Sequence, residues 1–298
     1  MPFKLIQALG LCLPASIFAA INIIDYTPLT NDRFMDDASF FAAGLDLSGV
    51  AIANTSQGPA FTGDDGGRWV TMISPNVFIT AHHFAPNVGQ SVTFYQTNSA
   101  LGGSFTASIE TTMQIGDTDI RVGTLDTSLP DDYAYYNIST ATISSEVPTA
   151  ITGPNALTFG RSEGDYATSL DMAVGHNNIN IFYPEQTFAG STGDAIVMTF
   201  DDPGIVYESQ FSLGDSGAPA MILEGGELTI VGINWFVGTL SDGETEISGL
   251  SFLPNYQSEI QAFIDENEEV APVPEASAGA LLLGVGALTL ALGMRRSL

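Results

Sequence analysis

Three short segments of this 298-residue chain carry side chains that could act together in nucleophilic catalysis. The segment "SLGDSGAPA" places Ser216 between two glycines, and histidine occurs only at His82, His83 and His176. A serine hydroxyl is a poor nucleophile unless a neighbouring base takes its proton and an acid orients that base. A glycine-flanked turn also lets main-chain N–H groups point at one spot, where they stabilise an oxyanion. We therefore take Ser216 as the candidate nucleophile, with the N–H groups of Gly214 and Ser216 as oxyanion donors.

The surroundings of these residues resemble the chymotrypsin-like (trypsin-like) serine proteases. "GDSGAP" is similar to the family's GDSGGP nucleophile motif, and "RWVTMISPNVFITAHHF" (68–84) is similar to its strand–turn–strand that ends in TAAHC. In that register His83 is the general base. "DIRVGTLDTSLP" (119–130) resembles the segment that carries the catalytic aspartate, which makes Asp119 the orienting acid. The resemblance covers about residues 49–266 and implies a triad that needs no metal and no organic cofactor.

Two of these assignments have alternatives in the sequence. His82 is adjacent to His83 and is the alternative base. When Thr80 and Ala81 are aligned with the first two residues of the family's TAAHC motif, His83 falls on the histidine of that motif and is therefore preferred. Asp132, in "DDYAYYNI", also precedes an apolar run. Asp119 is preferred because the residues that follow it fit the family segment better.

The same resemblance identifies the residues that line the substrate pocket. They are Gln210, Asn234, Trp235, Phe236 and Gly249. Gln210 stands where enzymes that cleave after Arg or Lys carry an aspartate, and Phe236 stands where they have a small glycine. The neutral amide of Gln210 and the bulky ring of Phe236 imply a pocket with no strong preference for substrate Arg or Lys side chains. Such a pocket favours small or medium apolar side chains instead.

Activation in this family depends on the aspartate before the nucleophile, here Asp215, which pairs with a freed N-terminal amine. The usual Ile-Val-Gly-Gly start is missing from this chain, and "SGVAI" (48–52) is its nearest counterpart. We expect residues 21–48 to be a propeptide or an N-terminal extension. The sequence leaves the partner of Asp215 open between an N-terminus and four arginines, which are Arg33, Arg68, Arg121 and Arg161.

Both ends of the chain carry targeting patterns. Residues 1–20 have one lysine, an apolar run and then small residues, which is typical of a secretory signal peptide. Residues 276–294 carry no charge and two arginines follow, so we expect a transmembrane segment with the main body outside. With the "VPEAS" that begins in the linker 269–275, the tail 276–298 resembles a PEP-CTERM sorting signal. That resemblance implies an exosortase-like processing enzyme as a partner and a periplasmic or cell-surface location.

The composition predicts a turn-rich β protein. Hydrophobic residues make up 45% of the chain, which also has 31 glycines and 15 prolines, and short apolar runs separated by turn residues begin near residue 49. With the resemblance, this pattern implies an all-β, chymotrypsin-like double six-stranded β-barrel over residues 49–268. The periodic segment 255–269 predicts a C-terminal helix. The only cysteine, Cys12, lies in the predicted signal peptide, so we expect no disulfide in the exported part.

The charge balance argues against a nucleic-acid partner. The formal net charge is −27, and without Lys4, Arg295 and Arg296 the exported part keeps four basic residues against 34 acidic ones. Phosphate contacts need Lys and Arg, of which the exported part would have only these four. Such an acidic surface suits high ionic strength, where self-repulsion is screened.

These observations lead to one expected function and two alternatives. We expect an exported serine endopeptidase that hydrolyses protein or peptide substrates through Ser216, His83 and Asp119. The first alternative is a catalytically silent binding or surface-matrix protein on the same fold, because a fold does not fix a function. The second is an esterase-like hydrolase that uses the same three residues.

Overall fold

The computed structural model describes residues 20–35, 38–54, 67–162, 170–201 and 204–268. All of them except Glu268 belong to one folded unit, Met1–Asn267. Residues 1–19 of the predicted signal peptide, the linker 269–275 and the predicted transmembrane segment 276–294 lie outside the described residues. In the part of the chain that is described, no helix is long and apolar enough to cross a membrane.

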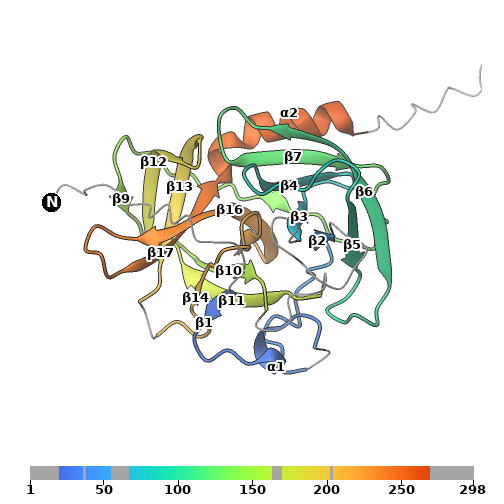
Figure 1. The fold of residues 1–298 in the computed structure, drawn as a ribbon, viewed down its shortest axis with the longest axis horizontal. Helices are drawn as coiled ribbons and strands as arrows, with labels where there is room; N and C mark the ends of the chain where they lie inside the picture. The colour runs from blue at the N-terminus through green and yellow to red at the C-terminus, as the bar shows by residue number, and fades with distance from the viewer. Residues whose placement is uncertain (1–19, 36–37, 55–66, 163–169, 202–203, 269–298) are drawn as a thin grey trace, which may run out of the picture. The chain divides into compact units, whose positions relative to one another are not determined.

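Six strands in the first half of the chain form a closed antiparallel barrel, in the order β2-β3-β4-β7-β6-β5 (Figure 1). They are β2 (Val50–Asn54), β3 (Arg68–Met72), β4 (Val77–Ala81), β5 (Ser91–Tyr95), β6 (Ser104–Gln114) and β7 (Ile120–Leu125). In β5 the buried residues Val92 and Phe94 alternate with more exposed ones, which is the period-two pattern of a half-buried strand. The strand–turn–strand predicted within residues 68–84 is confirmed, because β3 and β4 pair as antiparallel neighbours with Thr71 opposite Ile79.

The second half of the chain forms a nine-stranded sheet. Its order is β11-β10-β15-β16-β17-β13-β12-β9, and β8 pairs with β16 as a parallel branch. The strands are β8 (Asn137–Ile138), β9 (Thr149–Ala150), β10 (Asn155–Gly160), β11 (Ala173–Asn178), β12 (Ile181–Phe188), β13 (Ser191–Thr199), β15 (Pro219–Glu224), β16 (Glu227–Thr239) and β17 (Glu246–Phe252). One apolar core of this sheet includes Phe182, Ile196, Leu250 and Phe252.

This sheet differs from the second six-stranded barrel that we expected. Among the described residues no ladder joins β11 to β13, so the sheet is not closed. The Asn177 side chain of β11 donates instead to the Thr199 carbonyl of β13, at 2.9 Å. The hydrogen-bonding edge of β13 that is turned away from β17 is already paired with β12, which extends the sheet.

The barrel and the sheet pack against each other through one continuous apolar core. Ile79 and Trp69 of the barrel belong to the same buried cluster as Phe159, Met221 and Ile233 of the sheet. Helix α2 (Gln257–Asn267) follows the short 3-10 helix η2 (Leu253–Tyr256) and adds Ile260, Phe263 and Ile264 to this cluster. It runs along the top of the view in Figure 1, and it confirms the predicted C-terminal helix.

Residues 21–48 pack as part of the same unit. The strand β1 (Asn22–Ile23) pairs with β14 (Ser209–Gln210), and helix α1 (Pro28–Asn31) begins at the capping residue Thr27. Ile21, Phe40 and Leu47 are each at most 4% exposed. Removing the segment would therefore expose apolar side chains that are buried in the core.

Arg33 anchors this N-terminal segment to the barrel. Its side chain is 1% exposed and donates to the carbonyls of Val50 and Tyr95 and to the side chain of Asn98, each at 3.0 Å. Burial lowers the pKa of Arg33 to about 10. The hydrogen bonds satisfy a cation that would otherwise be costly to bury.

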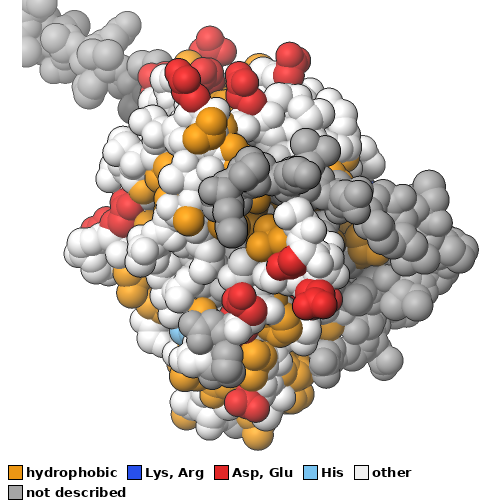
Figure 2. Space-filling view, turned by 90° about the vertical axis from the view of Figure 1, so that its left-hand side faces the viewer, with side chains coloured by type: hydrophobic (Ala, Val, Ile, Leu, Met, Phe, Trp, Pro, Cys, Tyr) orange, Lys and Arg blue, Asp and Glu red, His pale blue; other side chains and the backbone are white. Residues whose placement is uncertain are grey.

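The described surface is acidic, as the sequence indicates. Figure 2 shows Asp and Glu side chains across one face, and no Lys or Arg side chain is visible there among the residues that are not grey. Four arginines lie among the described residues, and three of them, Arg33, Arg68 and Arg161, have at least one side-chain N–H group withdrawn from solvent. They therefore offset little of the negative surface charge.

Candidate active site

The candidate base and acid lie at one end of two paired strands. β4 ends at Ala81, which is opposite Ile120 at the start of β7, and the His82 N–H donates to the Asp119 carbonyl at 2.9 Å. This register puts His83, just after β4, beside Asp119, just before β7. The main-chain N–H of His83 also donates to Asp119 Oδ1 at 2.9 Å, which fixes the carboxylate.

Ser216 completes a chain of hydrogen bonds that joins the barrel to the sheet. His83 Nδ1 lies 2.8 Å from Asp119 Oδ2, and His83 Nε2 lies 2.9 Å from Ser216 Oγ. Asp119 is 1% exposed, and the His83 side chain is 24% exposed. A buried carboxylate on Nδ1 favours the tautomer with its proton there, so Nε2 can accept the hydroxyl proton of Ser216.

The loop that carries Ser216 is a tight turn that depends on its glycines. Gly214 has φ +104° and Gly217 has φ +89°, a region that residues with side chains rarely adopt. A Cβ atom on Gly217 would lie only 2.6 Å from the Thr80 hydroxyl oxygen, so the loop can approach β4 only with glycine there. Within the described residues, the N–H groups of Gly214 and Ser216 donate to no protein acceptor, so both are available to an external oxyanion.

Asn234 holds this loop from the side of β16. Its side-chain amide donates to the carbonyls of Asp215 at 3.1 Å and Phe159 at 3.2 Å. Its main chain accepts from the Gly217 N–H and donates to the Ala218 carbonyl. Sequence reasoning placed Asn234 in the pocket but missed this supporting role, which no local pattern could reveal because its partners are distant in the chain.

Asp215 is fully buried behind the nucleophile. Its carboxylate accepts from the main-chain N–H groups of Arg161 at 2.7 Å and Ser212 at 2.8 Å. Burial raises the pKa of Asp215 to about 7, although these two bonds and the nearby Arg161 charge oppose the rise. Of the four arginines that the sequence left open, Arg161 is therefore the one beside Asp215.

The alternative histidine and aspartate have other partners. His82 Nδ1 accepts from Arg121 Nε at 3.2 Å, and burial together with that cation lowers the pKa of His82. The exposed Asp132 accepts from the Gln96 side chain. The structure thus brings His83 and Asp119, rather than His82 and Asp132, next to Ser216. His176 lies elsewhere, packed against Phe41 with ring centroids 4.7 Å apart and an interplanar angle of 60°.

Among the expected pocket residues, Asn234 is hydrogen-bonded to the nucleophile loop. Gln210 lies in β14, opposite Asn22 of β1. Trp235 and Phe236 are 2% and 6% exposed. A Cβ atom on Gly249 would clash with three atoms of the Phe236 ring, so the ring lies directly on this glycine.

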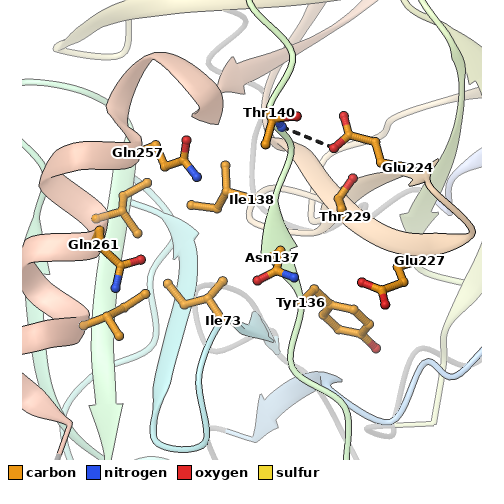
Figure 3. A pocket seen from close by; sticks show the side chains of 12 residues that line it. Ile73, Tyr136, Asn137, Ile138, Thr140, Glu224, Glu227, Thr229, Gln257 and Gln261 are labelled. Atoms are coloured by element: carbon orange, nitrogen blue, oxygen red, sulfur yellow. Dashed lines mark hydrogen bonds between the residues drawn. The ribbon is translucent and has the colours of Figure 1, made fainter.

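A separate cavity of about 370 Å³ lies between α2, β8 and the β15–β16 turn (Figure 3). Glu224 at its edge accepts from the Ser139 hydroxyl at 2.6 Å and the Thr140 N–H at 3.2 Å. None of the three candidate triad residues lines it. Across the described ranges, no group of three or more His, Cys, Asp or Glu side chains is arranged to hold a metal ion.

Comparison with known proteins adds no relative. A scan against protein-family models finds no match, and a search of the curated proteins finds no sequence with significant similarity. The functional inference therefore rests on the geometry of the site and on the sequence motifs.

Proposed function

We propose that this protein is an exported serine endopeptidase with a chymotrypsin-like fold. The observation that carries the proposal is the hydrogen-bonded series Asp119–His83–Ser216, with distances of 2.8 and 2.9 Å, beside two unused N–H groups. The placement of this series between a closed barrel and a β-sheet supports the fold assignment. The open edge of the second sheet is the main difference from a double barrel.

The geometry supports a two-stage acyl transfer. Ser216 Oγ attacks the peptide carbonyl carbon while its proton passes to His83 Nε2, and the carbonyl oxygen becomes an oxyanion held by the N–H groups of Gly214 and Ser216. His83 then gives that proton to the leaving amine, and the C–N bond breaks to leave an acyl-enzyme. Water attacks the ester in the same way: its proton passes to His83 and then to Ser216 Oγ as the new carboxylic acid leaves. Asp119 keeps the imidazole oriented and stabilises its charged form.

Hydrolysis of a protein substrate such as casein by the purified exported protein tests this proposal. We expect Ser216→Ala and His83→Ala to abolish turnover, because either change removes the nucleophile or its base. Ser212→Ala is the matched control, because its hydroxyl lies in the same loop and its hydrogen bonds with Asp215 are made by its main chain. The Ser212 N–H donates to the Asp215 carboxylate at 2.8 Å, and the Ser212 carbonyl accepts from the Asp215 N–H at 3.1 Å. Equal turnover by the wild type and Ser216→Ala would reject the proposal, and turnover of esters without peptides would favour an esterase.

Export, processing and anchoring belong to the same proposal. They rest on the sequence patterns of residues 1–20 and 269–298 and on the resemblance to an exosortase-processed sorting signal. Mass spectrometry of both ends of the protein recovered from cells would test them. Intact ends would count against both targeting assignments.

A further inference from the structure

We propose that Arg68 and Trp69, the first two residues of β3, are positioning residues that set the base His83 against the oxyanion turn at Gly214. This inference rests on the proposed peptidase function. It gives a role in catalysis to two side chains that lie outside the triad. That role concerns the rate of the chemical step, and not the choice of substrate.

Arg68 and Trp69 point to opposite faces of β3, because successive side chains of a strand alternate. Trp69 is fully buried and belongs to the apolar core that the barrel shares with the sheet. The next residue, Val70, belongs to the core inside the barrel, which is the side of the strand that Arg68 also takes. The start of β3 can therefore contact two different segments of the site, one with each side chain.

The Arg68 guanidinium lies over the ring of Phe84, the residue that follows the base. Its central carbon is 3.5 Å from the ring centroid, a distance at which the aromatic face attracts a cation. The centroid of the Phe84 ring lies 6.4 Å from that of His83. Within the described part of the chain, residues 84–86 make no main-chain hydrogen bond. Side-chain contacts such as this one must therefore fix the chain just after the base.

Trp69 approaches the nucleophile loop on both sides of Ser216. Its indole N–H donates to the Gly214 carbonyl at 3.3 Å. A Cβ atom on Gly217 would lie 3.6 Å from the Trp69 Cβ, so the loop also comes close to Trp69 after the nucleophile. Gly214 has φ +104° and a flexible main chain. The bond to its carbonyl restricts that flexibility and so orients its N–H, which is one of the two oxyanion donors.

The residue before Arg68 adds a second link to the nucleophile loop. The Gly67 carbonyl accepts from the Arg161 side chain at 3.1 Å, and the main-chain N–H of Arg161 donates to the Asp215 carboxylate at 2.7 Å. Residues 67–69 thus join the segment after the base to the loop of the nucleophile through one strand end. A misplacement of about 1 Å between reacting groups can cost roughly 100-fold in rate, so this link bears directly on catalysis.

The test measures kcat and KM per active site on a peptide substrate, with the active sites counted by titration with a fluorophosphonate. Trp69→Phe keeps a ring and removes the N–H that holds Gly214, so kcat should fall by roughly 10-fold with KM unchanged. Arg68→Met removes the cation over Phe84 and should lower kcat by roughly 10-fold as well. Arg68→Lys keeps a cation there and should restore part of the loss.

A double-mutant cycle tests whether the Arg68 effect passes through Phe84. Phe84→Leu should lower kcat about as much as Arg68→Met, and the double variant should be no slower than either, because both changes remove the same contact. Phe105→Leu is the control. It removes a ring that packs on Tyr133 in the barrel, with centroids 6.2 Å apart, and should leave kcat unchanged.

A merely structural role would lower the number of titrated sites and leave kcat per site unchanged. That result for Trp69→Phe and Arg68→Met would overturn the inference and leave the peptidase proposal standing, and if Arg68→Met does not fold, Trp69→Phe alone decides. Additive losses from Arg68→Met and Phe84→Leu would overturn their contact as the cause. No reaction of the wild type at Ser216 with any serine-directed probe would overturn the inference and the proposed function together.

Discussion

A free amino group at Ile21 should change how the stability of the protein responds to pH. Ile21 is 1% exposed and its N–H donates to the Arg161 carbonyl at 3.0 Å. A Cβ atom on Gly160 would lie 2.5 Å from Ile21 Cβ and 2.8 Å from the carboxyl carbon of Asp215, so both residues contact the same side of this glycine. Cleavage of the predicted signal peptide after Ala20 would place a new amine in this buried region.

The magnitude follows from the buried carboxyl of Asp215. With the chain continuing before Ile21, burial raises the pKa of Asp215 from 3.8 to about 7. Between these values the folded protein retains a proton that the unfolded chain releases, so stability falls as pH rises from about 4 to about 7. Three pH units correspond to about 4 kcal/mol. A cationic amine at Ile21 would stabilise the ionised form of the Asp215 carboxyl. It would thereby remove this loss of stability with rising pH.

The assay compares the free energy of unfolding of two forms between pH 4 and pH 7. One form begins at Ile21 and the other retains Ala19 and Ala20. Asp215→Asn is made in each form, because its difference from the parent isolates the contribution of this one carboxyl. The extended form should lose about 4 kcal/mol relative to its Asp215→Asn variant across this range, and the Ile21 form should lose much less.

Identical pH slopes for the two parent forms would refute the reasoning. They would show that the amine at Ile21 does not interact with Asp215. If the free energy of unfolding of the extended form did not fall between pH 4 and pH 7, the raised pKa of Asp215 would be refuted. Such a result would mean that burial does not keep Asp215 protonated near neutral pH.

Three further predictions concern other parts of the molecule. Asp119→Asn should lower kcat by roughly 10³–10⁴-fold, because the amide cannot hold the correct imidazole tautomer, whereas Asp132→Asn should leave kcat unchanged; equal effects in a peptide assay would reverse the assignment. Arg33→Met should destabilise the protein by about 3 kcal/mol, since three buried or partly buried acceptors lose their donors, and an unchanged denaturation midpoint would count against Arg33 as an anchor. Because the net charge is −27, thermal unfolding should shift upward as NaCl is raised from low concentration, and a downward shift would contradict the role of self-repulsion.

Local patterns in the sequence were sufficient for the strands of the barrel and for the last helix. The short apolar runs in "RWVTMIS" and "NVFITA" are joined by a Ser-Pro-Asn turn, and they form β3 and β4. In the last helix, Ile260, Phe263 and Ile264 share one face, and all three are buried. Each of these signals lies within about a dozen residues, where periodicity is strongest.

Features that depend on distant pairing could not be predicted. The two-residue strand β1 pairs with β14, more than 180 residues later, and neither is long enough to show a periodic pattern. Asp119 and Asp132 both precede apolar runs, and only the register of β4 against β7 brings Asp119 to His83. The paired outer edge of β13, which leaves the second sheet open, is equally invisible in the local sequence.

Labelling by a fluorophosphonate, followed by peptide mass mapping, tests the central claim most directly. The reagent modifies a serine only where a base and an oxyanion site activate it, so we expect a single adduct at Ser216 in the protein as recovered from cells. Ser216→Ala and His83→Ala should abolish it, and Ser212→Ala should retain it. An unlabelled wild type, or an adduct that persists in Ser216→Ala, would contradict the assignment of Ser216 as an activated nucleophile.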